Sequence, residues 1–64
     1  MKNRIKEIVA ERGIKQSWIA KKIGKSNNIV SAYLSNRIQP PLPVIVEIAK
    51  VLNVKVDELI SNDE

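Results

Sequence analysis

Apolar residues recur along this 64-residue chain at steps of three and four, which is the spacing of one face of a helix. Polar and charged residues occupy most of the positions between them. The pattern predicts five helices, at 2–12, 16–23, 26–35, 42–52 and 56–60. The residues predicted to face inward are Ile5, Ile8, Val9, Ile19, Ala20, Ile23, Val30, Tyr33, Leu34, Leu42, Ile45, Ile48, Ala49 and Leu52. The sequence therefore predicts an all-α fold.

Residues that tolerate unusual backbone angles separate the predicted helices. Gly13, Gly24, Asn36 and Asn53 follow the first four of them. Glycine adopts a left-handed conformation at little cost, and asparagine is the next most tolerant residue, so each can end a helix. The three prolines of segment 39–43 fit only a loop or a first helical turn. Segment 39–43 is therefore expected to be a stiff connection into the fourth helix.

Segment 16–35 has the most informative pattern of the chain. Two short helices meet there across Gly24, and the Ser26 side chain can accept a hydrogen bond from the amide of Asn28 or Ile29 and so begin the second one. Polar residues then face outward at the start of that second helix. This is the layout of a helix-turn-helix DNA reader, whose second helix enters the major groove.

Spaced motifs along nearly the whole chain carry a family resemblance. They are Gln16-x-x-x-Ala20, Gly24, Ser26, Val30, a turn ending in Pro40, Ile48-Ala49-Lys50-x-Leu52 and Asp57-Glu58-Leu59. From Met1 to Ile60 the chain resembles the Cro and phage-repressor family of small bacterial and phage helix-turn-helix regulators, with restriction-modification controller proteins as a candidate sub-class. The resemblance implies a compact five-helix, lambda-repressor-like DNA-binding domain at 1–60, followed by an acidic tail at 61–64. It also implies a homodimer that binds a near-palindromic operator and regulates transcription, usually as a repressor.

Charge is distributed unevenly along the sequence. The net charge is +4, but all 11 Lys and Arg lie between Lys2 and Lys55, where only three acids occur, so that region carries 11 minus 3, or +8. The other four acids gather at the C-terminus, at Asp57, Glu58, Asp63 and Glu64. A basic face of this kind is expected to meet phosphate. A domain this small buries only about 60% of its unfolded surface, so dimerisation would help to stabilise it.

The outward residues of the third helix are the candidate readers of DNA bases: Asn27, Asn28, Ile29, Ser31 and Ala32. Asparagine can pair with adenine N6 and N7, and a methyl group can touch thymine. Two alternatives stay open. Ile29 either contacts a thymine methyl or packs beneath the edge of its helix, and the asparagines also suit a helix start for capping reasons alone.

A second set of residues is expected to hold DNA phosphates: Lys15, Gln16, Lys25, Ser26, Ser35 and Arg37. The resemblance places a basic phosphate contact at Arg37. It also places a Ser or Thr cap where this chain has Lys15, and a lysine at a helix N-terminus opposes the helix dipole by about 0.3–1 kcal/mol. Either that cost is tolerated, or an adjacent phosphate offsets it in the complex.

Other apolar residues suggest contacts outside the recognition helix. Val54, Val56, Leu59 and Ile60 are many apolar residues for a short final segment, and the resemblance places the dimer contact nearby, so these four are the expected dimer interface. Tyr33 matches a buried position of the family. Trp18 lies off the main apolar stripe, where it could support a phosphate contact, cover the core edge or face a partner. The dimer contact and the role of Trp18 are thus left to the tertiary structure.

Other classes of protein fit the chain less well. The chain has no His, no Cys and no glycine-rich phosphate loop, so neither an enzyme nor a metal or cofactor site is expected. No apolar run approaches the roughly 18–20 residues of a membrane span, and the lack of cysteine fits a reducing cytoplasm. The sequence contains no evident small-molecule sensor. The rival hypothesis is an antitoxin-like or other protein-interaction module with this fold, against which the polar start at 25–28 favours nucleic acid.

Overall fold

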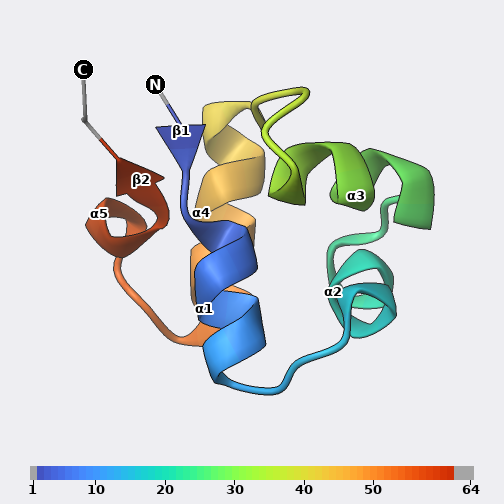
Figure 1. The fold of residues 1–64 in the computed structure, drawn as a ribbon, viewed down its shortest axis with the longest axis horizontal. Coiled ribbons are helices and arrows are strands. Elements are labelled where there is room, and N and C mark those ends of the chain that lie inside the picture. The colour runs from blue at the N-terminus through green and yellow to red at the C-terminus, as the bar shows by residue number, and fades with distance from the viewer. Residues whose placement is uncertain (1, 62–64) are drawn as a thin grey trace.

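The computed structural model describes residues 2–61 and contains five helices and one pair of very short strands. The helices are α1 (Ile5–Glu11), α2 (Gln16–Ile23), α3 (Asn27–Leu34), α4 (Leu42–Leu52) and α5 (Val56–Leu59). The strands are β1 (Lys2–Asn3) and β2 (Ile60–Ser61). Figure 1 shows α2 and α3 on one side of the molecule and α5 with β1 and β2 on the other. The five-helix, all-α fold predicted from the sequence is confirmed.

The helix ends follow the local signals of the sequence. Gly13, Gly24, Asn36 and Asn53 all have positive φ, between 58° and 70°. The Ser26 hydroxyl accepts a hydrogen bond from the amide of Ile29 at 3.2 Å, as a serine N-cap does. These predictions are therefore confirmed, and the expected absence of a side-chain cap at the start of α2 is confirmed as well.

A long-range pairing shortens the first and last helices relative to the sequence prediction. β1 and β2 pair antiparallel, with Lys2 opposite Ser61 and Asn3 opposite Ile60. The amide of Arg4 also donates to the carbonyl oxygen of Leu59 at 2.8 Å. Helix α1 therefore begins only at Ile5, and α5 ends at Leu59 rather than at residue 60. Helical periodicity cannot reveal this pairing, because its partners lie at opposite ends of the chain.

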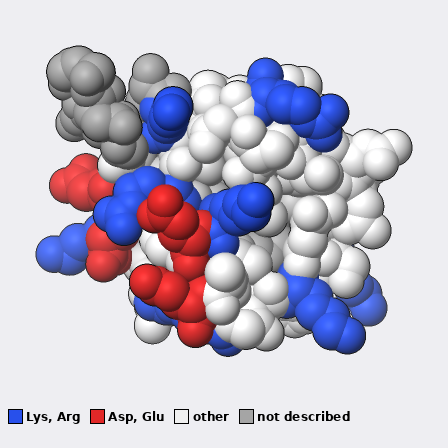
Figure 2. Space-filling model, viewed as in Figure 1, with Lys and Arg blue, Asp and Glu red and all other residues white. Residues whose placement is uncertain are grey.

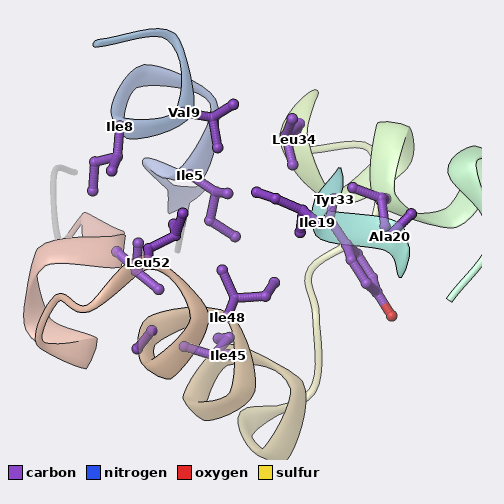
Figure 3. Close-up of a cluster of buried hydrophobic side chains, with 13 residues drawn as sticks. Ile5, Ile8, Val9, Ile19, Ala20, Tyr33, Leu34, Ile45, Ile48 and Leu52 are labelled. Atoms are coloured by element: carbon purple, nitrogen blue, oxygen red, sulfur yellow. The ribbon is translucent and has the colours of Figure 1, made fainter. Parts of the chain in front are cut away.

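The core is a cluster of aliphatic side chains from all five helices. Ile5, Ile19, Val30, Ile48 and Leu59 are completely buried. Figure 3 shows side chains of α1, α2 and α4 pointing toward one another, with the Tyr33 hydroxyl directed away from the cluster. Tyr33 is buried, as expected. The helices thus share one core, which fixes α3 relative to the rest of the domain.

Two of the sequence predictions about burial are wrong. Leu42 is 63% exposed, because it is the first residue of α4 and the buried residues of that helix begin only at Ile45. Leu59 is 0% exposed, because α5 folds back onto the core. Leu42 therefore leaves the predicted core, and Leu59 leaves the predicted dimer interface.

The acidic tail expected at 61–64 lies outside the described residues except for the backbone of Ser61. No helix within residues 2–61 is both long enough and apolar enough to traverse a lipid bilayer.

Replacing Gly24 by alanine should destabilise the protein by about 1 kcal/mol, because an L-residue is strained in the left-handed conformation. Gly24 has φ +70°, and a Cβ built there would meet no atom within 4 Å, so backbone strain is the only cost expected. Urea unfolding followed by circular dichroism measures the loss. Ser17→Ala on the exposed side of α2 is the control, and a Gly24→Ala protein as stable as that control would contradict the explanation.

Candidate nucleic-acid interface

Helix α3 is held in place from both sides. On its inner side, Val30, Tyr33 and Leu34 are buried in the core. At its start, the Gln16 Nε2 of α2 donates to the carbonyl oxygen of Asn27 at 3.0 Å. The small Ala20 of α2 is also buried, and a side chain of this size lets a neighbouring helix pack closely. Helix α3 is therefore a rigidly positioned element of the domain.

The C-terminal end of α3 is anchored to β1 by side-chain amides. The buried Asn3 donates from Nδ2 to the carbonyl oxygen of Tyr33 at 2.8 Å and to Gln39 Oε1 at 3.1 Å. Asn36 Oδ1 accepts from the backbone amide of Asn3 at 2.9 Å. Asn36 thus has two functions, because it also adopts the left-handed turn that ends the helix. This network fixes the turn that carries Arg37.

The exposed start of α3 is polar. Ser26, Asn27 and Asn28 are exposed, and Ser31, one turn further, is half-buried. The first amides of a helix have no acceptor within the helix, and because Ser26 takes up that of Ile29, the amides of Asn27 and Asn28 are the ones available to an anion. The geometry therefore offers two amide side chains and a helix N-terminus on one surface.

Two of the expected base readers are less exposed than the sequence predicted. Ala32 is only 6% exposed, and the turn after α3 folds back against its backbone, since the amides of Arg37 and Ile38 both donate to its carbonyl oxygen. Ala32 cannot offer its methyl group to a base and is removed from the base-reading set. Ile29 is half-buried and packs against the core, which favours the second of the two alternatives for that residue.

Ser35 and Arg37 form a hydrogen-bonded pair after α3. Ser35 Oγ donates to the carbonyl oxygen of Ala32 at 3.3 Å and accepts from Arg37 Nε at 3.1 Å. Because Nε is occupied by Ser35, the guanidinium group is oriented while its terminal nitrogens stay available to a phosphate. Ser35 therefore positions Arg37, a function that its place in the sequence did not reveal.

A small hollow brings a lysine of α1 to the same surface. It has a volume of about 150 Å³ and is lined by Lys6, Gln16, Ser31, Leu34 and Ser35. Three of the expected DNA-contacting residues thus meet there. Lys6 is not among the residues predicted from the sequence, because it lies outside the helix-turn-helix segment. Its positive charge is the only feature of the sequence that suggests a contact with phosphate.

The electrostatic asymmetry expected from the sequence is present in three dimensions. Residues 12–46 contain six Lys and Arg and no acid, and they include all of α2 and α3. In Figure 2 the acidic groups gather over the side that carries α1 and α5, and none is visible over α2 and α3. Arg4, the residue before α1, forms an ion pair with Glu7 of that helix, with 3.0 Å between Nε and Oε1. A phosphate that approaches α3 therefore meets only basic and neutral groups on α2 and α3.

Two crossed helices joined by a three-residue turn, with the second helix polar on its outer side, define a helix-turn-helix domain. The helix-turn-helix family model matches residues 5–59, and the chain belongs to this family. The match confirms the resemblance found in the sequence.

Individual relatives agree with this assignment. The chain is 30% identical to an uncharacterized helix-turn-helix-type transcriptional regulator of Archaeoglobus fulgidus, over 100% of this chain and 91% of the relative. It is 42% identical to a candidate DNA-binding protein of Bacteroides fragilis whose crystal structure superposes with a TM-score of 0.91, over 94% and 97% of the two chains. The structure of a Listeria innocua transcriptional regulator, 22% identical, shares the fold with a TM-score of 0.75, over 98% and 68%. None of these three is described as an enzyme.

Proposed function

We propose that this protein is a sequence-specific regulator of transcription that binds double-stranded DNA as a homodimer, with residues 26–35 in the major groove of a near-palindromic operator. Its simplest mode of action is repression in the cytoplasm, by occupying a promoter. The observation that carries the proposal is the pair Asn27 and Asn28, exposed at the start of a firmly held helix that, like its neighbour α2, contains no acidic residue. Side-chain amides of this kind can read adenine in the major groove.

The proposed contacts separate into readers and holders. Asn27, Asn28 and Ser31 read base edges, whereas Ile29 packs against the core. The holders bind phosphates and fix the register of the domain on the duplex. They are Lys15, Gln16, Lys25, Ser26, Ser35 and Arg37, and we add Lys6 because it lines a hollow with Gln16 and Ser35. Most of the affinity is then expected from the holders and most of the sequence preference from the readers.

The proposed dimer contact lies at the end of the chain. Val54, Val56 and Ile60 are half-buried, so each keeps apolar surface available to a second copy. The described domain measures 31 Å along its longest axis. Two such domains related by a two-fold axis can place their recognition helices about 34 Å apart, which is one turn of DNA.

Selection of bound duplexes from a random DNA library, at about 150 mM salt where non-specific attraction is weakened, tests the proposal. We expect a two-fold symmetric motif whose half-sites lie about one helical turn apart. A reporter promoter that carries this motif should then be silenced by the protein. A folded protein that enriches no motif would refute sequence-specific binding, and an asymmetric motif would refute the symmetric dimer.

Lys6→Gln should weaken binding to every duplex and lower the salt dependence of log K by about 0.9, the value for one lost phosphate contact. The expectation follows from the hollow that Lys6 shares with Gln16 and Ser35. Fluorescence anisotropy of a labelled duplex at several salt concentrations measures it. The matched control is Lys50→Gln, an exposed lysine in the last turn of α4. Equal salt slopes for the two variants would exclude Lys6 from the interface.

A further inference from the structure

An open apolar hollow lies beside the connection between α1 and α2. It has a volume of about 570 Å³, against about 150 Å³ for the hollow at Lys6. Its lining residues are Gly13, Ile14, Lys15, Ser17, Trp18 and Lys21. Of these, only Lys15 belongs to the proposed DNA contacts, so the hollow needs a separate explanation.

Trp18 has the largest side chain of the residues that line this hollow. It is 42% exposed, although its neighbours Ile19 and Ala20 are buried on the other side of α2. Lys22 Nζ lies over the indole ring, 5.4 Å from its centroid. An exposed tryptophan beside an apolar depression is typical of the central contacts of protein interfaces. Ile14, half-buried against the core, adds a second apolar surface.

The charges around the hollow are all positive. Lys15 and Lys21 line it, and Lys22 sits over the tryptophan ring. The nearest acids along the chain are Glu11 on one side and Glu47 on the other, and neither lines the hollow. Carboxylates are therefore the complementary groups for its rim, while its wall suits an apolar side chain.

The position and chemistry of the hollow distinguish it from the recognition surface. In Figure 1 the connection between α1 and α2 runs along the lower edge of the molecule, whereas α3 lies above α2. Phosphates are usually held by hydrogen-bond donors, whereas Gly13, Ile14 and Trp18 offer mainly apolar surface here. These observations favour a protein partner over DNA at this site.

We propose that this hollow, which we call the Trp18 hollow, binds an acidic segment of a partner protein. One large apolar side chain of the segment packs against Trp18 and Ile14, and flanking carboxylates pair with Lys21 and Lys22, neither of which belongs to the proposed DNA contacts. The inference does not rest on DNA binding. With the recognition helix on another part of the surface, the protein can hold a duplex and the acidic segment together.

Random peptides displayed on phage and selected on the full-length protein test this proposal. We expect the enriched peptides to place Asp or Glu on both sides of a Leu or Phe. Trp18 is the only tryptophan of the chain, so a tryptophan-free peptide that binds there should change its fluorescence emission directly. Selection of no peptides, or of peptides without acidic residues, would overturn the proposal.

Two variants with matched controls locate the binding site. Trp18→Ala should weaken a labelled peptide about tenfold or more, as loss of a central interface aromatic does, whereas Leu42→Ala on another exposed apolar residue should not. Lys21→Gln should weaken the same peptide more than Lys50→Gln does.

Duplex affinity of the Trp18→Ala protein should stay within about twofold of the parent, as for a residue outside the contact surface. If Trp18→Ala weakened the duplex as much as the peptide, the hollow would belong to the DNA interface and the proposal would be wrong.

Discussion

Leu59→Ala is expected to destabilise the protein by about 2–5 kcal/mol, the range for large-to-small substitutions in a packed core. Leu59 is the fully buried residue of α5, and its carbonyl oxygen accepts from the amide of Arg4 beside the short strand pair. A chain of this size has a total stability of about 3–10 kcal/mol, so the loss would be a large fraction of it. A fraction of the molecules would then be unfolded at moderate temperature.

Leu42→Ala is the matched control, because it makes the same chemical change in another helix at a residue that is 63% exposed. Its expected cost is within about 0.5 kcal/mol. Urea unfolding of both variants should be compared at one protein concentration, since dimerisation would contribute to the measured stability. Similar losses for the two variants would contradict the assignment of Leu59 to the core and of Leu42 to the surface.

Asn28→Ala should reduce binding to the selected operator by about 1–3 kcal/mol and leave binding to unrelated duplexes nearly unchanged. Asn28 is exposed at the start of α3, so its removal should cost direct contacts to a base and little structure. Arg37→Ala should instead weaken all duplexes and lower the salt slope by about one. Competition between operator and random-sequence DNA, measured over a range of salt, separates the two effects.

The stability of each variant is the control for this comparison, because both residues lie on the surface and should leave urea unfolding unchanged within about 0.5 kcal/mol. Ser35→Ala adds a more specific check. It removes the hydroxyl that accepts from Arg37 Nε, and so should give a weaker form of the Arg37→Ala phenotype. If Asn28→Ala and Arg37→Ala behaved alike, the separation of readers from holders would be wrong.

Sequence reasoning recovered part of the candidate interface. The exposed Ser26, Asn27 and Asn28 follow from helical periodicity after a glycine turn, and the structure places them on the surface. Ala32 and Ile29 share that periodicity but are less exposed than these three residues. The turn after α3 folds back onto the carbonyl oxygen of Ala32, and a helical repeat contains no information about such a turn. Lys6 belongs to α1 and lines a hollow with residues of α2 and α3, and no local sequence pattern connects α1 with α3.

The sequence by itself determined the five helices, the helix ends that a glycine or asparagine marks, and the charge asymmetry of this protein. These features depend on local properties: the spacing of apolar residues, the backbone freedom of Gly13, Gly24, Asn36 and Asn53, and the formal charges. Only the tertiary structure decided which apolar residues are covered, since burial depends on how separate surfaces meet. It placed Leu59 in the core, exposed Leu42 and Trp18, and joined Asn3 to Asn36 across 33 positions of the chain. Contacts between such distant residues arise from the packing of whole elements, which the pattern along a single helix does not contain.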